Sequence, residues 1–275
     1  MPELPEVETI KRSLEKKIAG QTINSVELYM PKIIRCPLPE EFMEKLTGKK
    51  ILRMGRRGKY LLMHLSGGAT LVVHLRMTGR LVYSPPDAPL DKHTHAVFGL
   101  SGGQQLRYSD IRQFGRICFA ENGELKNLPG LKDLGVEPLE EQFTRDYLKK
   151  ELKRRRTRIK SLLLDQTIIA GLGNIYADEA LFRARVHPEK IASALTPREI
   201  ARLYRAILDV LQESIENRGT SFRDYVDGEG QSGSNQLSLR VYSREGHPCV
   251  DCGKPLARIK VGGRSSYFCP CCQKA

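Results

Sequence analysis

A cluster of closely spaced cysteines near the C-terminal end is the feature that most constrains the fold of this chain. Two CxxC hooks, predicted on separate hairpins, follow one another in the order Cys249-x2-Cys252-x16-Cys269-x2-Cys272. Four thiolates at such a spacing suit a tetrahedral Zn²⁺ site with Zn–S distances of about 2.3 Å. All four ligands come from the protein, so we expect one structural zinc ion that stabilises a segment too small for its own core. Cys271 is a fifth thiol that could compete as a ligand.

The charge of the chain points to a polyanionic partner. Its 45 Lys and Arg residues against 32 Asp and Glu residues give a net charge of +13. Nucleic acid is the commonest polyanion inside cells, whereas binding to an anionic membrane would call for an amphipathic anchor or a lipidation signal. The start, MPELPEVETI, is acidic and lacks the apolar segment of a secretory signal. We expect a cytoplasmic protein that associates with the nucleoid.

The first half of the chain favours one helix followed by strands. Apolar residues recur at helical spacing from Glu6 to Ile18, and Gly20 ends that pattern. Short β-rich runs then alternate with glycine turns, at Thr22–Tyr29, Lys50–Met54, Tyr60–Leu65, Thr70–Leu75, Ala96–Leu100, Gln105–Ser109 and Arg116–Ala120. This pattern predicts a β-sandwich or barrel. The isolated Cys36 and Cys118 are expected to be small buried residues.

The second half is predicted to be helical, which gives an α+β multidomain protein overall. Helical patterns cover Phe143–Leu164, Ile175–Ala184 and Pro197–Asn217, and the polar, glycine-rich residues 227–236 are expected to be mobile. We predict an N-terminal β-sandwich domain with its N-terminal helix, a linker, a helical domain and a zinc-finger hairpin, over residues 1–132, 133–147, 148–236 and 237–275.

Two neighbouring segments of the helical region indicate contact with phosphates. Residues 149–160 contain eight basic residues in twelve, which could equally form a solvated helix face. Gly171-Leu172-Gly173-Asn174 then opens a new helix, where free backbone N–H groups and small residues allow close approach of a phosphate. Together they resemble a helix–two-turn–helix phosphate clamp.

The N-terminus carries the most specific chemical signal. Met1 precedes a small residue, so its removal is expected to leave Pro2 with a free amine. An α-amine titrates near 8, well below lysine, and cations such as Lys59 and Arg112 could lower the pKa of Pro2 further. A secondary amine that attacks a sugar carbon gives an iminium ion that favours β-elimination, and Glu3 could act as a general acid. Taken alone, Pro2-Glu3 could also be merely a rigid start.

The motifs together resemble the formamidopyrimidine-DNA glycosylase family. The resemblance rests on Pro2-Glu3-Leu4-Pro5-Glu6-Val7-Glu8-Thr9, Arg56-Arg57-Gly58-Lys59-Tyr60-Leu61, His74-Leu75-Arg76-Met77-Thr78-Gly79-Arg80-Leu81, Tyr108-Ser109-Asp110-Ile111-Arg112-Gln113-Phe114-Gly115, Gly171-Leu172-Gly173-Asn174-Ile175-Tyr176-Ala177-Asp178-Glu179 and the cysteine module. They occur in the family's order over essentially the whole chain. The resemblance implies a bifunctional DNA glycosylase and AP lyase of base excision repair, acting as a monomer on double-stranded DNA that contains oxidised bases.

The same resemblance implies roles for individual residues. Pro2 would be the Schiff-base nucleophile and Glu3 the proton donor. Lys59 would assist β-elimination and Arg264 δ-elimination, although both could instead only bind phosphates. The DNA contacts implied are His74, Met77, His93, Arg112, Phe114, Arg155, Asn174 and Tyr242. Among these, Met77, Arg112 and Phe114 would fill the gap left by a flipped base, which recovers part of the cost of extruding it.

The match is weaker in the loop predicted to close over the flipped base. Ser234-Asn235-Gln236 lacks an aromatic residue that is often found there, and Ser243 stands where glycine is usual. His93 and His95 could each be structural. Three hypotheses follow: a glycosylase for oxidised purines (8-oxoguanine opposite cytosine and formamidopyrimidines), an endonuclease-VIII-like enzyme for oxidised pyrimidines, and a non-catalytic zinc-module DNA-binding protein. Met77, Arg112 and Phe114 favour the first.

Overall fold

A computed structural model of the chain describes residues 1–121 and 123–274, and these divide into two compact units. The first unit contains Met1–Lys132 and Asn217–Gln236, and the second contains residues 133–216 and those from 237 onward. Residues 217–236 therefore pack with the β-rich unit, although the sequence places them with the helical region. Each unit is described by itself.

The first unit is a β-sandwich that carries the N-terminal helix, as predicted. Its helices are α1 (Leu4–Ile18) and α2 (Pro39–Leu46). One sheet has the strand order β2-β9-β5-β4-β3 and the other β1-β7-β8-β6. The strands are β1 (Ile23–Leu28), β2 (Ile34–Cys36), β3 (Ile51–Arg57), β4 (Tyr60–Leu65), β5 (Thr70–His74), β6 (Gly79–Ser84), β7 (Thr94–Leu100), β8 (Gln105–Asp110) and β9 (Arg116–Ala120). Within these sheets β2 and β9 pair in parallel, and the other pairs are antiparallel.

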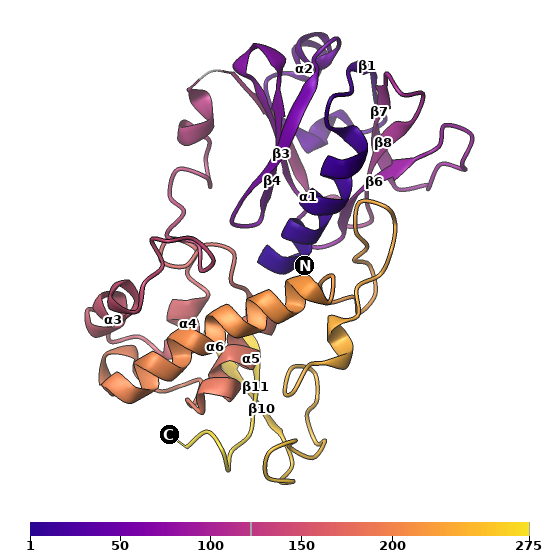
Figure 1. The fold of residues 1–275 in the computed structure, drawn as a ribbon. Helices are drawn as coiled ribbons and strands as arrows, with labels where there is room; N and C mark the ends of the chain where they lie inside the picture. The colour runs from indigo at the N-terminus through magenta and orange to yellow at the C-terminus, as the bar shows by residue number, and fades with distance from the viewer. Residues whose placement is uncertain (122, 275) are drawn as a thin grey trace. The chain divides into compact units, whose positions relative to one another are not determined.

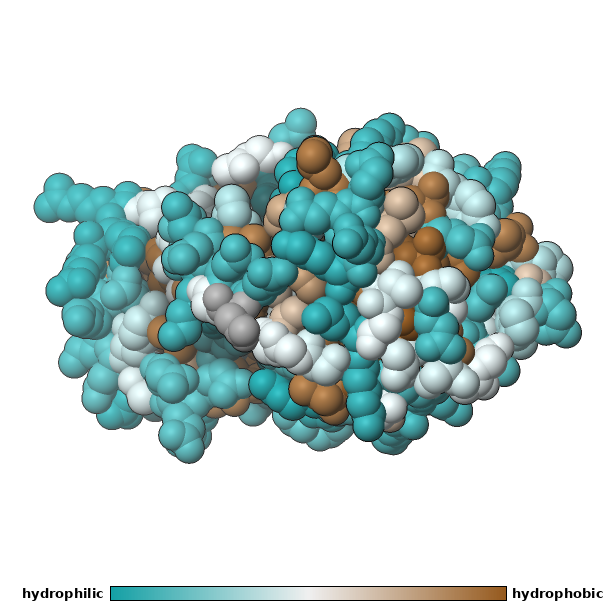
Figure 2. All heavy atoms as spheres, turned by 90° about the horizontal axis from the view of Figure 1, so that it is seen from above, coloured by the Kyte–Doolittle hydropathy of each residue, from teal (hydrophilic) through white to brown (hydrophobic). Residues whose placement is uncertain are grey.

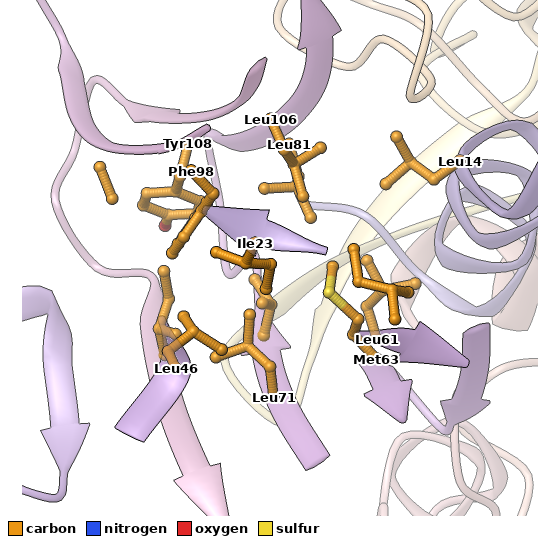
Figure 3. Packing of buried hydrophobic residues seen from close by; sticks show 14 of the residues in the cluster. Leu14, Ile23, Leu46, Leu61, Met63, Leu71, Leu81, Phe98, Leu106 and Tyr108 are labelled. Atoms are coloured by element: carbon orange, nitrogen blue, oxygen red, sulfur yellow. The ribbon is translucent and has the colours of Figure 1, made fainter. Parts of the chain in front are cut away.

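A single apolar core joins the two sheets and α1. Leu14 of α1, Leu61 and Met63 of β4, Leu81 of β6 and Phe98 of β7 are all buried in it. Figure 3 shows these side chains converging between the strands and the helix. Because β4 alternates side chains between its two faces, Leu61 and Met63 point to the same side. The core fixes α1 beside β3 and β4 (Figure 1) and so positions the start of the chain.

Several short elements were not predicted. Strand β2 has only three residues, strand β6 lies in a stretch without clear alternation, and α2 is too short for helical periodicity to show. The parallel pairing of β2 and β9 places Cys36 opposite Cys118. Both thiols are partly exposed, so the expectation of two isolated, buried cysteines was wrong.

The second unit is helical and ends in a two-stranded hairpin. Its elements are α3 (Arg145–Lys153), α4 (Ile159–Leu163), α5 (Asn174–Ala184), α6 (Pro197–Glu216), β10 (Ala257–Val261) and β11 (Arg264–Phe268). The sequence predicts one helix over residues 143–164, whereas the structure has two, α3 and α4. The chain breaks at the basic residues 154–158, where Arg158 pairs as an isolated bridge with Ile191 and the backbone N–H of Ile159 donates to the Lys190 carbonyl. Repulsion between like charges four residues apart, as at Arg154 and Arg158, disfavours a continuous helix there.

Short 3₁₀ helices complete the fold: η1 (Pro31–Ile33), η2 (Ser66–Gly68), η3 (Glu124–Asn127), η4 (Ala192–Ala194) and η5 (Asn235–Leu237). Figure 2 shows hydrophilic side chains covering most of the face in view, with apolar ones scattered among them. Among residues 1–121 and 123–274, no helix combines the length and the apolar character needed to cross a bilayer.

Candidate active site and DNA-contact residues

The start of the chain is buried and hydrogen-bonded rather than frayed. Pro2 and Glu3 are both buried, and Glu3 is the N-cap residue of α1. The backbone N–H of Glu3 donates to Oε2 of Glu6 over 2.8 Å, and the backbone N–H of Thr220 donates to Oε1 of the same carboxylate over 2.8 Å. One carboxylate thus joins the predicted nucleophile segment to residues 220–236, the loop that is predicted to close over a flipped base. Sequence reasoning did not single out Glu6, although it lies in the quoted N-terminal motif.

Lys59 lies in the turn between β3 and β4, and a buried ion pair fixes that turn to α1. The Arg56 guanidinium donates to Glu8 over 3.0 Å and to the Gly58 carbonyl over 3.2 Å. Burial raises the pKa of Glu8, but the hydrogen bond from Arg12 and the charges of Lys11 and Arg56 outweigh it, so the pKa lies below its ordinary value. The Lys59 side chain itself is buried. Helix α1 and the turn that carries Lys59 are therefore held by one network.

His74, at the end of β5, is neutral at physiological pH. The residue is only 8% exposed, and its ring packs edge-on to Tyr60 with the ring centroids 4.5 Å apart. Burial, followed by the charges of Arg76 and Lys59, lowers the pKa of His74 to about 3. Nδ1 accepts a hydrogen bond from the backbone N–H of Arg76 over 3.0 Å. A contact from His74 to a phosphate would therefore be that of a neutral imidazole.

The turn that follows β8, and the turn between β5 and β6 that carries Met77, expose the residues predicted to enter DNA. Phe114 is 52% and Met77 39% exposed, and the Arg112 guanidinium lies 4.8 Å from the centre of the Phe114 ring. Ile111 is also exposed, and sequence reasoning missed it. Large apolar side chains left exposed in this way are typical of a binding surface.

Asp110 organises this turn, and sequence reasoning did not assign it a role. Its buried carboxylate accepts the hydroxyl of Thr78 and the backbone N–H groups of Arg112 and Gly115, the last two over 3.2 and 2.8 Å. Its backbone N–H donates to the His93 carbonyl over 3.0 Å. Asp110 was visible only as a member of the quoted motif, because its contacts with Thr78 and His93 cannot be inferred from spacing.

The two histidines that the sequence leaves undecided differ in the structure. His95 is buried, and its Nε2 lies 2.8 Å from the Asp110 carbonyl oxygen, which gives it a structural role. His93 is partly exposed and contributes its backbone to the same turn. Of the two, His93 alone keeps a side chain accessible to a partner.

The glycine-rich segment expected to be mobile is instead extensively hydrogen-bonded. Oδ1 of the fully buried Asp227 accepts the backbone N–H groups of Glu229 and Gln231 over 2.9 and 3.0 Å. The backbone of Gly228 donates to the Ser13 hydroxyl over 2.9 Å and accepts from the Tyr83 N–H over 2.8 Å. The segment needs no apolar face because Asp227 and backbone groups provide its contacts.

In the second unit, a buried ion pair and the Ser265 carbonyl connect Asn174 to the hairpin that carries Arg264. Lys160 and Asp178 are both fully buried with their charged atoms 2.7 Å apart. Burial raises the pKa of Asp178 to about 7 against the opposing effect of Lys160. The Ser265 carbonyl accepts from Lys160 over 2.7 Å and from the Asn174 amide over 3.1 Å.

The hairpin turn itself explains the exposed position of Arg264. Gly262 and Gly263 both have positive φ, at 55° and 78°, as a two-residue hairpin turn requires. Arg264 follows this turn and is exposed, next in sequence to the Ser265 that contacts Asn174. The hairpin therefore presents its arginine near the first turn of α5, whose backbone N–H groups favour an anion.

A buried carboxylate fixes the backbone around Tyr242. Glu179 accepts the backbone N–H groups of Arg240, Val241 and Tyr242 over 2.8–3.0 Å, which fixes the chain at Tyr242. The Tyr242 ring is half-buried and lies edge-on to Tyr267.

Arg155, just after α3, is bound to a residue in the last turns of that helix. Its guanidinium is paired with the Glu151 carboxylate and also donates to the Glu151 carbonyl over 3.1 Å. A phosphate contact at Arg155 would have to compete with this pair.

The four predicted zinc ligands converge. The sulfur atoms of Cys249, Cys252, Cys269 and Cys272 all lie within 4.8 Å of one another. The Sγ atoms of Cys252 and Cys269 are 3.5 Å apart and those of Cys249 and Cys272 4.0 Å, close to the roughly 3.8 Å edge of a tetrahedral Zn–S₄ site. Among the described residues Cys271 is exposed and outside this group. The donor set fits one structural zinc ion.

Comparison with protein-family models identifies the family of the chain. The N-terminal domain of formamidopyrimidine-DNA glycosylase matches residues 1–117, its H2TH domain residues 134–226, and the zinc finger found in FPG and IleRS residues 246–275. The chain belongs to the formamidopyrimidine-DNA glycosylase family. Its zinc finger accordingly holds one structural zinc ion.

Relatives of the glycosylase cover the whole chain. The formamidopyrimidine-DNA glycosylase of Pelotomaculum thermopropionicum is 64% identical over 274 residues, which are 100% of this chain and 99% of that protein. The Bacillus licheniformis glycosylase is 46% identical over 276 residues, with 100% of each chain covered.

Two solved Lactococcus lactis structures share the fold and were determined with damaged DNA. A mutant of that enzyme in complex with Fapy-dG DNA has a TM-score of 0.94, 39% identity and 100% coverage of each chain. The wild-type enzyme with an oxidised pyrimidine in DNA has a TM-score of 0.93 at 39% identity, again with 100% of each chain covered.

Proposed function

We propose that this glycosylase removes oxidised purines from double-stranded DNA and then cleaves the abasic site, as a monomer in the cytoplasm. Membership in the family along the entire chain carries the proposal. The glycosylase and lyase activities are those of the family, and the Lactococcus lactis complex with Fapy-dG DNA supports the substrate class. The exposed, basic Arg112–Phe114 turn supports the same conclusion, because extruding a base leaves a gap that must be filled.

The chemistry begins at Pro2 once Met1 has been removed, because the Pro2 nitrogen is otherwise part of a peptide bond. The free amine attacks C1′ of the deoxyribose, the N-glycosidic bond breaks, and the base leaves with a proton that balances the one lost by the amine. Glu3 donates a proton to the ring oxygen O4′ as the sugar opens, which leaves an iminium ion on Pro2. Loss of a C2′ proton then expels the 3′ phosphate, and elimination of the 5′ phosphate follows.

The remaining predicted residues bind the strand during these steps. The Arg56–Glu8 network fixes the turn that carries Lys59 to α1, and we assign Lys59 to the phosphate that leaves in β-elimination. Arg264, Asn174 and the first turn of α5 form a second anion site, and we assign Arg264 to δ-elimination. His74, His93, Tyr242 and Arg155 complete the proposed DNA contacts, with Arg155 the weakest because Glu151 already binds it.

A second substrate class has a specific observation in its favour. The Lactococcus lactis enzyme, similar over this whole chain, was also solved with an oxidised pyrimidine in DNA. Oxidised pyrimidines are therefore proposed as secondary substrates. A trapping assay can compare a duplex that contains 8-oxoguanine with one that contains an oxidised pyrimidine.

Borohydride trapping tests the proposal. Reduction during turnover on an 8-oxoguanine:C duplex should attach DNA to Pro2, as located by peptide mapping, and an oxidised-pyrimidine duplex should trap less. Glu3→Gln should lose base excision while still cleaving preformed abasic sites, and the exposed Glu44→Gln is the matched control. Base release without an adduct on Pro2 would refute the amine mechanism.

A further inference from the structure

We propose that Cys36 and Cys118 form a dithiol modification site, which closes to an intramolecular disulfide when an anionic disulfide enters the cavity that both thiols line. The reagent class is a small disulfide with negatively charged groups. The zinc site, at the other end of the chain, and the proposed catalytic residues take no part in this reaction.

The pairing of the strands places the two thiols together. Cys36 at the end of β2 is the register partner of Cys118 in β9. Paired strands lie about 4.8 Å apart, within the Cα separation of roughly 4.4–6.8 Å that a disulfide requires. A local irregularity separates this pair from the Ile34–Ile117 pair, which gives the short edge strand room to adjust.

A cavity of about 490 Å³ in the first unit opens onto both thiols. Three guanidinium groups line it, from Arg35, Arg76 and Arg116, and no carboxylate belongs to its lining within the described residues. The backbone at Gly130 passes close to the Tyr60 hydroxyl and forms another part of the wall. A cavity with only positive charges concentrates anions, so an anionic disulfide is favoured over a neutral one.

The electron balance is complete with that reagent. The Cys36 thiolate attacks one sulfur of RS–SR, which forms a Cys36–SR mixed disulfide and releases RS⁻. Cys118 then attacks the Cys36 sulfur, breaks the bond to SR and releases the second RS⁻. The two thiol protons end on the released thiolates, so the pair loses two electrons and RS–SR becomes two RSH. Cys36 reacts first because burial, followed by the hydrogen bond with Cys36, raises the pKa of Cys118 to about 12.

The site is next to the turn that the proposed function uses. Lys32 of η1, just before β2, donates to the Gln113 side chain over 2.7 Å. Cys118 lies in β9, which follows that same turn directly. A bond between Cys36 and Cys118 would therefore join the two segments that flank the Arg112–Phe114 turn.

The test uses the zinc-loaded full chain carrying Cys271→Ser, which removes an exposed thiol. The native protein is treated with dithiobis(nitrobenzoate), a dianionic disulfide, while zinc release is monitored. We expect two equivalents of thionitrobenzoate per chain, loss of two hydrogen masses, a Cys36–Cys118 cross-linked peptide, and reversal by dithiothreitol. Cys118→Ser should release one equivalent and retain a mixed disulfide on Cys36. Separate adducts on the two thiols, or a cross-link that forms only after denaturation, would overturn the proposal.

Neutral dithiodipyridine provides the test of the cavity's charge. We compare the rate of reaction with anionic dithiobis(nitrobenzoate) to the rate with neutral dithiodipyridine. This ratio should fall by about twofold in Arg35→Gln and in Arg116→Gln, because each variant loses one positive charge beside the thiols. The exposed Arg53→Gln is the matched control. An unchanged ratio in both cavity variants would show that the cavity does not select the reagent. These measurements need no DNA, so their outcome is separate from that of the proposed glycosylase activity.

Discussion

The Arg56 guanidinium donates to the Glu8 carboxylate over 3.0 Å, and the two side chains are only 6% and 9% exposed. The same guanidinium binds the Gly58 carbonyl, so one ion pair joins α1 to the turn that carries Lys59. Glu8 and Arg56 are 48 residues apart and belong to two separate sequence motifs. This relationship gives the first unit its most specific stability prediction.

Removal of one member of this pair should be strongly destabilising. We expect Arg56→Met to cost about 3–5 kcal/mol, because it leaves the Glu8 charge buried with fewer partners. Urea unfolding of the zinc-loaded chain measures the effect, with the exposed Arg53→Met as control. Combining Arg56→Met with Glu8→Gln should cost less than the sum of the single changes. Strict additivity would mean that the two side chains do not interact.

Asp110→Asn should weaken base excision while leaving the fold intact. The amide nitrogen cannot accept a hydrogen bond, so the Arg112–Gly115 backbone loses part of its support. A lost buried hydrogen bond costs about 1–3 kcal/mol, which predicts a fall of about tenfold in kcat/KM on an 8-oxoguanine:C duplex. Steady-state kinetics check this, with the exposed Asp87→Asn as control. Wild-type kinetics in Asp110→Asn would remove Asp110 from the machinery that positions the turn.

Local patterns predicted much of the fold. The hydrogen bonds that buried carboxylates accept from residues far away in the sequence could not be predicted. Strands Tyr60–Leu65 and Arg116–Ala120 were placed to the residue, because their mostly apolar runs are bounded by turn residues. The zinc ligands were found from spacing alone, since each CxxC hook supplies two thiolates locally. Asp110, Glu8 and Glu179 were missed because each has at least one partner, Thr78, Arg56 and Val241 respectively, that only the tertiary fold brings near it.

The burial of His74 predicts a specific pH dependence of stability. Its pKa in the folded chain is about 3, against an ordinary value of 6.5, so the unfolded chain binds the proton more readily below pH 6.5. Stability is therefore fully present above pH 6.5 and is lost as the pH falls toward 3. Between pH 6.5 and 5 the loss from His74 should be about 2 kcal/mol.

Urea unfolding at several pH values tests this assignment. The difference in unfolding free energy between wild type and His74→Asn should shrink as the pH falls from 7 to 5, because the variant lacks the titrating group. The exposed His247→Asn should show no such trend. Parallel pH profiles for wild type and His74→Asn would contradict a neutral, buried His74.

Ser243 occupies a backbone conformation that suits glycine, with a φ of 61°. A residue with a side chain pays about 1 kcal/mol to adopt this left-handed region, so Ser243→Gly should stabilise the second unit by up to about that amount. Part of the gain is offset because glycine makes the unfolded chain more flexible. Ser243→Ala keeps the Cβ and should give no gain, which makes it the matched control. Thermal unfolding compares the three chains. The DNA affinity of Ser243→Gly should be unchanged, because Glu179 fixes the backbone at Tyr242 independently. A lower Tm in Ser243→Gly than in Ser243→Ala would show that the flexibility that glycine adds to the unfolded chain outweighs the relief of backbone strain at this position.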